Sequence, residues 1–366
     1  MQPLPRQGCA RLAEIAKARA RAADADGPDW PTLGMTLGPN GDVMKLPRRE
    51  ALRIAAAVAA LPATVRIVNA ESYPARPVHM IVDLPAGLAP DVLARLVGPL
   101  LSQRLGEEFV IENKPGAGGN IGAEYVVHAA PDGYTLLVMI SGNAAGGALY
   151  PNLTFSFARD IAAIAFLGYT PFVVAINPSI PVKTIPELIA YAEANPGKLN
   201  FASPGAGTAP HLAFELFRMM TGVEIVHVPY RTAYVPDLLA GQVQLAFPAV
   251  PAVLGFIHSG KLQALGVTSA TRMAALPDVP TIADSVPGYE GSGWVGVGAP
   301  RATPANIVDK LNKEINAIVG DPAMKARFVV LGAEPQLMTP AEFDHLIASA
   351  ADKWAKVIKF ANIKPE

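Results

Sequence analysis

Three short segments of mostly small residues have the composition of anion-binding loops. They are Leu84–Asp91, Ser141–Gly147 and Ser203–Thr208, and each follows a β-rich run. Such loops expose backbone N–H groups, and two of these lead into expected helix N-termini, where unpaired N–H groups and the helix dipole favour negative charge. Because the segments contain no Lys or Arg, we expect backbone groups to hold an anion, with Arg231 as the candidate cation. Ordinary strand–helix turns are the competing interpretation.

Residues for covalent or metal-assisted catalysis do not form a recognisable pattern. The six histidines are scattered without an H-x-x-x-H or H-E-x-x-H pair, and neither a G-x-S-x-G elbow nor a P-loop is present. His211 follows Pro210 at an expected helix start, where it is a packed or capping histidine or a ligand-facing one. No acidic partner for it is apparent nearby in the sequence, which argues against a general base. We predict no catalytic residue and no metal site.

The glycine-rich segment Gly116–Gly122 is similar to a dinucleotide-binding loop, because it follows one expected strand and precedes a helix. Its glycine spacing is not G-x-G-x-x-G, and the next strand ends at Ser141 instead of an acidic residue that could bind a ribose. We therefore interpret the segment as a tight structural turn and predict no cofactor.

Composition narrows the class of protein. A chain of 366 residues, 51% of them hydrophobic, is long enough for two domains of about 150 residues. The net charge is −1, and the basic excess lies in residues 44–70, so the remaining body is acidic. An acidic body argues against a nucleic-acid partner, which requires a basic face. Cys9 is the only cysteine, so no disulfide can form within the chain.

Residues 44–70 have the organisation of an export signal. Basic residues from Lys45 to Arg49 precede an apolar stretch, Ala51–Pro62, and Val68–Ala70 resembles a cleavage site. The apolar stretch is too short to span a bilayer, which takes about 20 residues. The paired arginines suggest the twin-arginine (Tat) route. The usual aromatic residue or second leucine after them is absent, so Tat and Sec export both remain open. We expect a periplasmic protein.

The 43 residues before this signal are unexpected, since a signal peptide stands at the start of its chain. We hypothesise that translation begins at Met44 and that residues 1–43 are an upstream extension outside the protein. The alternative is a genuine disordered N-terminal arm that carries an amphipathic helix.

From residue 76 onward, strand-like and helix-like segments alternate, which predicts a mostly parallel sheet with helices on both faces. The expected strands are Val78–Val82, Phe109–Ile111, Tyr134–Met139, Phe172–Ile176, Leu199–Ala202, Glu224–Val228, Val243–Phe247 and Ala264–Val267. The expected helices are Asp91–Leu105, a helix ending near Ala129, Ile185–Asn195, Pro210–Met220, a short one from Pro236, and residues 304–319, 322–331 and 340–361.

Several motifs together resemble the Bug-type receptors, also called tripartite tricarboxylate transporter receptors (TctC-like). The motifs keep their order from about residue 73 to the end of the chain. They are Tyr73–Val78, Val110–Gly122, Ala130–Leu136, Asn195–Asn200, Gly205–Leu212, Val228–Arg231, Asp237–Val243 and Asp278–Thr281. Each motif is weak alone, whereas the ordered set is specific.

The resemblance implies a type II periplasmic binding protein-like fold. Two α/β lobes would be joined by a two-strand hinge, with the ligand cleft between them. We place the hinge crossings near residues 168–174 and 293–299. Lobe 1 would then comprise residues 73–170 and 299–366, and lobe 2 residues 171–298.

The resemblance also implies a solute-binding protein outside the cytoplasm. It would capture a small organic carboxylate, a dicarboxylate or an aromatic acid, partly through ordered water. A tripartite tricarboxylate-type permease would take up the ligand, or a sensor would respond to it. We expect a monomer without enzymatic activity. An enzyme on a two-lobed α/β scaffold acting on a small organic acid is the alternative, and an export-linked structural protein is a third possibility.

The candidate ligand-binding residues combine the resemblance with the loop analysis. The ligand loops of the family correspond here to Pro85, Ala86, Gly87, Asp91, Ser203, Gly205, Gly207, Thr208, Tyr230 and Arg231. The other small-residue segment and the flanking positions add Leu88, Ser141, Asn143, His211 and Thr232.

Two departures from the family pattern affect these loops. Leu88 replaces the second of two glycines, and Pro90 precedes Asp91. After Arg231 the usual glycine is absent, and the segment Thr232–Pro236 is shorter than in the family. Leu88 adds apolar bulk, and Tyr234 could add an aromatic wall. Both changes favour a bulky or aromatic acid over a compact polar one such as citrate.

Overall fold

The computed structural model describes residues 73–150, 152–230 and 233–364, which lie within one compact unit, Val68–Glu366. The expected signal segment at 44–70, the residues upstream of it, Arg231 and Thr232 lie outside the described residues. Within the described part of the chain, no helix is both long enough and apolar enough to cross a membrane.

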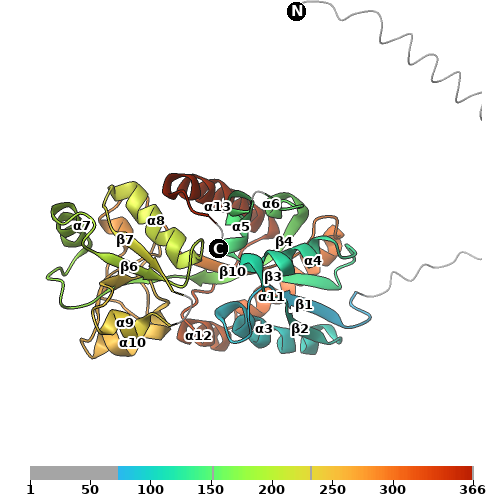
Figure 1. Cartoon of the computed structure of the whole chain (residues 1–366). Helices are drawn as coiled ribbons and strands as arrows, with labels where there is room; N and C mark the ends of the chain where they lie inside the picture. Colours follow the sequence, from blue (N-terminus) through green and yellow to red (C-terminus); the bar gives the residue numbers. More distant parts are fainter. Residues whose placement is uncertain (1–72, 151, 231–232, 365–366) are drawn as a thin grey trace, which may run out of the picture. The chain divides into compact units, whose positions relative to one another are not determined.

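Two five-stranded sheets form the framework of the protein (Figure 1). In the first sheet the strand order is β2-β1-β3-β10-β4, and in the second it is β7-β6-β8-β5-β9. The first sheet contains β1 (Val78–Val82), β2 (Phe109–Asn113), β3 (Thr135–Ile140), β4 (Ile161–Thr170) and β10 (Gly293–Pro300). The second contains β5 (Val173–Ile176), β6 (Asn200–Ser203), β7 (Val226–Pro229), β8 (Leu245–Ala246) and β9 (Gln263–Val267).

The prediction of a mostly parallel sheet is confirmed for four of the five strands in each sheet, and one strand in each runs against the others. In the first, β1 pairs in parallel with β2 and β3, but β10 runs antiparallel to β3 and β4. In the second, β6 pairs in parallel with β7 and β8, but β5 runs antiparallel to β8 and β9. The antiparallel strands, β5 and β10, are the first strands that the chain enters after it crosses from one sheet to the other. Their direction depends on this long-range pairing, which local alternation does not report.

Eleven helices are described. They are α3 (Ala89–Leu105), α4 (Asn120–Val127), α5 (Ser141–Leu149), α6 (Phe157–Asp160), α7 (Ile185–Ala194), α8 (Ala209–Thr221), α9 (Val235–Leu239), α10 (Val250–His258), α11 (Ala305–Val319), α12 (Pro322–Val330) and α13 (Pro340–Ala361). The three expected C-terminal helices are confirmed to within a residue at each end. The helices α5, α6 and α10 and most of β4 were not predicted, and β10 was expected only from the family resemblance, as a hinge crossing near residues 293–299.

Strand β10 does not have the residue pattern of a typical half-exposed strand. All eight of its residues are buried, so it lacks the alternation of a half-exposed strand, and glycine weakens its β propensity. Gly296 is required there, because an added Cβ would lie 2.2 Å from Cζ of Phe343 in α13. Strand β10 pairs with β4 along Gly293–Pro300. The lobe limits given above remain a prediction.

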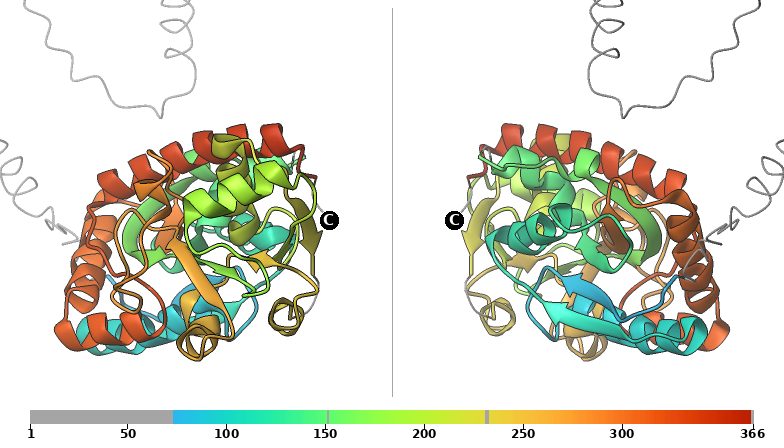
Figure 2. Two further views of the ribbon diagram at one scale, coloured as in Figure 1. Left: turned by 90° about the vertical axis from the view of Figure 1, so that its left-hand side faces the viewer. Right: turned by 90° about the vertical axis from the view of Figure 1, so that its right-hand side faces the viewer.

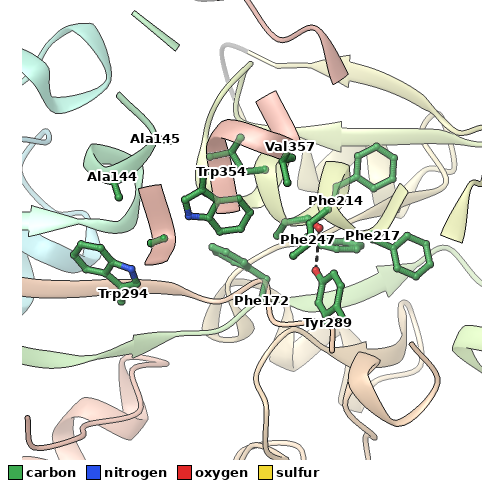
Figure 3. Packing of buried hydrophobic residues seen from close by; sticks show 14 of the residues in the cluster. Ala144, Ala145, Phe172, Phe214, Phe217, Phe247, Tyr289, Trp294, Trp354 and Val357 are labelled. Carbon is green, nitrogen blue, oxygen red and sulfur yellow. Dashed lines mark hydrogen bonds between the residues drawn. The ribbon is translucent and has the colours of Figure 1, made fainter. Parts of the chain in front are cut away.

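Helices cover both faces of each sheet. On the first sheet, alternate residues of β1 divide between the α3–α11 side and the side covered by α4, α5 and α13. On the second sheet, α7 and α8 pack on one face, and α9 and α10 on the other. One apolar cluster joins the two lobes, and Phe172, Phe214, Trp294 and Trp354 belong to it (Figure 3).

The terminal helix α13 contacts both lobes. It packs on α5 and β4 of the first sheet's lobe and on α8 of the second's, and it runs along one side of the molecule (Figure 2). Its N-terminus is fixed by a capping box. The Thr339 hydroxyl accepts a hydrogen bond from Glu342 N at 3.2 Å, and Thr339 N donates to the Glu342 carboxylate at 2.8 Å.

Strand directions determine where the binding loops can lie. At the β3–β10–β4 pairing, Ile140 lies opposite Val295, and Gly293 lies opposite Thr170, so the carboxyl end of β3 is at the edge where the chain leaves β4. The carboxyl end of β8 is likewise beside the start of β5, where Phe172 bridges to Ala249. The carboxyl edges of the parallel strands in both sheets therefore lie next to the connections between the lobes.

Candidate functional site

The first candidate loop leaves the carboxyl end of β1 and is held in place by Asp91. The carboxylate of Asp91 accepts hydrogen bonds from Gly87 N at 2.8 Å, Arg95 Nε at 3.0 Å and Asn113 Nδ2 at 3.0 Å. Burial alone would raise the pKa of Asp91, but these partners lower it below its usual value. Asp91 therefore shapes the loop through contacts within the protein.

Other predicted residues of this loop face solvent. Pro85, Ala86, Gly87 and Leu88 are exposed, and 48% of the Leu88 surface is accessible. The loop ends at the N-terminus of α3, where Leu88 is the N-cap and Pro90 occupies the first turn. An apolar side chain therefore stands at this helix N-terminus.

The prediction of a loop at Ser141–Gly147 is wrong, because these residues form most of α5. Ser141 begins the helix, and Asn143 Oδ1 accepts a hydrogen bond from Ile140 N at 2.8 Å, which caps it. Both side chains are buried, with 3% and 2% of their surfaces accessible. The structure thus provides a helix N-terminus directly at the carboxyl end of β3. This is a stronger anion-binding element than a loop, since its first-turn N–H groups lack intrahelical partners.

Beneath α5 lies a buried acid that the sequence analysis did not single out. Asp83 follows β1 and is fully buried, and neither carboxylate oxygen has a hydrogen-bond partner among the described residues. Burial raises the pKa of Asp83 to about 7, although the nearby Asn143 amide acts in the opposite direction. An added Cβ on Gly119 would lie 2.7 Å from the Asp83 carboxylate. Glycine in that turn therefore makes room for the acid.

The second candidate loop, Ser203–Thr208, links β6 to α8 and bonds extensively to itself. Gly205 N donates to Ser203 Oγ at 3.1 Å, and Thr208 Oγ1 donates to the Gly205 carbonyl at 2.8 Å. Gly207 N donates to Nδ1 of His211 at 2.9 Å. These amides are therefore engaged within the protein, and the first turn of α8 offers the N–H groups for an anion.

His211 has an acidic partner, which corrects the expectation that none lay nearby. Glu215, one helical turn further along α8, places Oε1 3.5 Å from His211 Nε2. Burial would raise the pKa of Glu215, but the hydrogen bond with His211 and the charge of Arg218 lower it. His227 of β7 stacks on His211 with ring centroids 3.8 Å apart. Histidines distant in sequence thus form a stacked pair behind the second loop, in which His211 is buried and His227 is partly buried.

The third candidate segment follows β7. Tyr230 N donates to the Ser203 carbonyl at 2.9 Å, so this segment lies beside the second loop. The Tyr230 hydroxyl donates to Asp237 at 2.8 Å, and its ring lies 6.2 Å from that of Tyr234. Burial raises the pKa of Tyr234 to about 12. The candidate cation Arg231 and its neighbour Thr232 lie outside the described residues.

Gly207 of the second candidate loop lies against the end of helix α5. An added Cβ there would lie 2.5 Å from Leu149 Cδ2, at the end of α5. The helices α5 and α8 belong to different lobes, so this contact joins the second candidate loop to the first lobe. The structure therefore brings together candidates from both sheets.

A separate cavity of about 200 Å³ lies beside the connections, between α13 and the start of β10. Its wall includes Tyr169, Trp294 and Trp354, with Lys353 bonded to Glu290 at 2.8 Å. None of the predicted ligand-binding residues lines it. Within the described ranges, no group of three or more His, Cys, Asp or Glu side chains could hold a metal ion.

The residues beside the candidate segments that sequence reasoning missed are Asp83, Glu215, His227 and Leu149. An acid directly after a buried strand was a readable signal for Asp83, and the i,i+4 spacing from His211 was one for Glu215. His227 and Leu149 reach the loop only through tertiary packing, so no local pattern identifies them.

Comparison with known proteins agrees with this geometry. The sequence model described as the tripartite tricarboxylate transporter family receptor matches residues 93–363. The BugT protein of Bordetella pertussis is 37% identical over 302 residues, which span 81% of this chain and 93% of that protein.

Two solved structures are also similar. The R. palustris protein Rpa4515, solved with adipate, is 36% identical with a TM-score of 0.69, over 80% of this chain and 100% of that one. MatC from Rhodopseudomonas palustris, with bound malate, is 30% identical with a TM-score of 0.66, over 78% and 100%. These matches confirm the predicted fold of two α/β lobes. The chain belongs to the family of tripartite tricarboxylate transporter receptors.

Proposed function

We propose that this protein captures a small organic carboxylate outside the cytoplasm and delivers it to a tripartite tricarboxylate-type permease. One observation carries the proposal: both sheets direct small-residue segments and helix N-termini toward the connections between the lobes. The N-termini of α3, α5 and α8 can favour an anion through backbone N–H groups and helix dipoles. Lobes that close around a ligand at such a hinge would trap it.

A carboxylate is the anion that the relatives favour. Rpa4515 was solved with adipate and MatC with malate. Since this chain's body is net acidic, local dipoles must hold the carboxylate, with Arg231 as the proposed cation. The proposed ligand-binding residues are those of the two loops, the start of α5, and the Tyr230–Thr232 segment.

The remaining parts of the proposal follow from the family. Residues 44–70 would direct export to the periplasm by the Tat or the Sec route, and the mature protein would act as a monomer that returns its ligand unchanged. In the alternative form of the proposal, the protein presents the ligand to a sensor instead of a permease and uses the same binding site.

We further propose a bulky or aromatic acid as the preferred ligand. Leu88 presents apolar surface at the N-terminus of α3, where the family has a glycine, and Tyr230 and Tyr234 supply aromatic surface after β7. Apolar groups at the rim favour a ligand with an apolar body because its burial removes that surface from water. A compact polar acid gains less from these side chains.

A thermal-stability screen of the purified protein tests the function. The panel is adipate, malate, citrate, benzoate and terephthalate, with sodium chloride as the ionic-strength control. A ligand at 100 times its dissociation constant should stabilise the folded state by about 2.7 kcal/mol. Mass spectrometry of the protein–ligand mixture after incubation should recover the acid unchanged. Conversion of the acid would favour the enzyme alternative, and the absence of stabilisation by any acid would contradict carboxylate capture.

Substitution of Leu88 tests the preference. In Leu88→Gly, the ratio of affinity for benzoate over malate, measured by calorimetry, should fall by about tenfold, because about 1.4 kcal/mol of apolar contact is lost. Leu337→Gly is the matched control, since Leu337 is similarly exposed at 49% and lies in an irregular segment before α13. Tight binding of malate and citrate by the unmodified protein, without benzoate binding, would contradict the preference.

A further inference from the structure

The stacked histidines hold the Ser203–Thr208 loop from behind. Gly207 N donates to His211 Nδ1 at 2.9 Å, and Ser203 Oγ lies 2.6 Å from His227 Nε2. The two imidazole planes are 14° apart, and only 4% of His211 is exposed. The stacked pair, of which His211 is buried and His227 partly buried, therefore contacts both ends of the loop.

The Gly207 contact specifies the protonation state of His211. An N–H group donates toward Nδ1, so that nitrogen must carry a lone pair, and the ring proton lies on Nε2. Nε2 is 3.5 Å from Glu215 Oε1, and Glu215 is in turn held by Arg218 at 2.9 Å. Of the two neutral tautomers, Glu215 therefore favours the one with the proton on Nε2, in which Nδ1 can accept from Gly207.

We propose that His211, oriented by Glu215, is a positioning residue that keeps the Ser203–Thr208 loop in its ligand-binding shape only while the imidazole is neutral. Protonation of Nδ1 would place two N–H donors against each other, and the bond to Gly207 would break. Gly207 has a φ of +74° and packs on Leu149, so its peptide could not turn without disturbing the contact between the lobes. Acid therefore releases the loop and weakens capture. This inference rests on the proposed assignment of the loop to the ligand site.

Of the two stacked histidines, His211 is the one that contacts Gly207. Its ionisable neighbours among the described residues are Glu215 and Arg218 on α8 and His227 on β7. Burial, followed by the proximity of His211, lowers the pKa of His227 to about 4. His227 thus stays neutral above pH 5 and keeps its contact with Ser203.

A ligand-free measurement tests the loop. In ¹⁵N NMR of the whole protein at pH 7.5, His211 should carry its proton on Nε2 alone, and the Gly207 amide should be protected from hydrogen exchange. As the pH is lowered, Gly207 should lose protection at the midpoint at which His211 gains its second proton. A proton on Nδ1 at pH 7.5, or Gly207 protection that is independent of pH, would overturn the proposal.

Three variants extend the test to capture, with adipate as the probe. His211→Asn keeps an acceptor near the position of Nδ1 and cannot titrate, so between pH 7.5 and pH 5 its affinity should change only by the part that protonation of adipate and of Asp83 contributes. His211→Leu lacks the acceptor and should bind about tenfold more weakly at both pH values, equivalent to about 1.4 kcal/mol. The unmodified protein should resemble the first variant at pH 7.5 and the second at pH 5.

His258→Asn is the matched control, because His258 is exposed at the end of α10. The His258→Asn variant should leave the acid response unchanged. The part of the response that comes from the loop should disappear only when His211 is replaced. An unaltered acid response in His211→Asn would contradict the proposal. If adipate does not bind at all, the proposed function is in question, whereas the NMR measurement still decides whether His211 holds the loop.

Discussion

At the scale of single residues, Asp83 is an acid whose buried environment disfavours the charged form of its carboxyl group. It is fully buried behind the first candidate loop, and its two oxygens lack hydrogen-bond partners among the described residues. Burial raises its pKa from 3.8 to about 7. In the unfolded chain the carboxyl ionises above about pH 4, whereas in the folded protein it stays protonated until about pH 7. Stability should therefore fall as pH rises through this window.

Replacement of Asp83 by Asn should remove this dependence on pH. The unmodified protein should lose about 1.4 kcal/mol of unfolding free energy per pH unit relative to Asp83→Asn, approaching about 4 kcal/mol in total. At pH 8 the net gain of the variant should be about 1–3 kcal/mol, because the new amide also lacks a full set of partners. Urea unfolding at pH 4, 6 and 8 measures it. Asp309→Asn, at an exposed position of α11, is the control. Parallel stability curves for Asp83→Asn and the unmodified protein would refute the assignment.

At the scale of elements, α5 shows how tertiary packing outweighs local propensity. Its sequence, Ser141–Leu149, is rich in glycine, which disfavours a helix, and the sequence analysis therefore predicted a loop. The helix forms because Asn143 caps its first turn and because the helix packs on α13. Where cap and periodicity agree with propensity, as at Thr339 before α13, the predicted helix is confirmed.

At the scale of the whole molecule, contacts between lobes decide the geometry of the candidate site. The second candidate loop meets α5 through Gly207 and Leu149, and α13 contacts α5 and α8. The apolar cluster that contains Trp294 and Phe172 is continuous across the connections (Figure 3). A change at the Gly207 contact should therefore affect both lobes.

Gly207→Ala should destabilise the protein more than its backbone conformation alone requires. A positive φ costs a non-glycine residue about 1–2 kcal/mol, and the clash with Leu149 should add about 1–3 kcal/mol or force the lobes apart. Urea unfolding and small-angle X-ray scattering would report the two outcomes. Gly222→Ala is the control, since Gly222 has a φ of +75° with no described atom of another segment within 4 Å of the added Cβ.

A second substitution, Leu149→Ala, removes the side chain with which the added Cβ would clash and so tests the cause of the destabilisation. In a Leu149→Ala background, Gly207→Ala should cost no more than Gly222→Ala does. Equal costs for the Gly207 and Gly222 substitutions in the unmodified background would show that Leu149 does not constrain the loop.

The sequence by itself determined those features that depend on neighbouring residues. Periodicity and caps predicted most helices and the strands of the parallel layers, and the ordered motifs predicted the two-lobed family fold. The loop composition also placed the candidate residues at the carboxyl ends of strands. Asp83 and Glu215 carried local signals too, in the acid that follows β1 and the i,i+4 spacing from His211.

Only the tertiary structure decided the features that depend on residues distant along the chain. The direction of β10, the helical state of α5, the stacking of His211 on His227 and the contact between Gly207 and Leu149 all arise this way. Each is set by packing between segments of different lobes or strands, where burial and steric fit outweigh local preference. Local patterns therefore predicted the candidate segments, whereas the contacts of His227 and Leu149 with the second candidate loop arise only from tertiary packing.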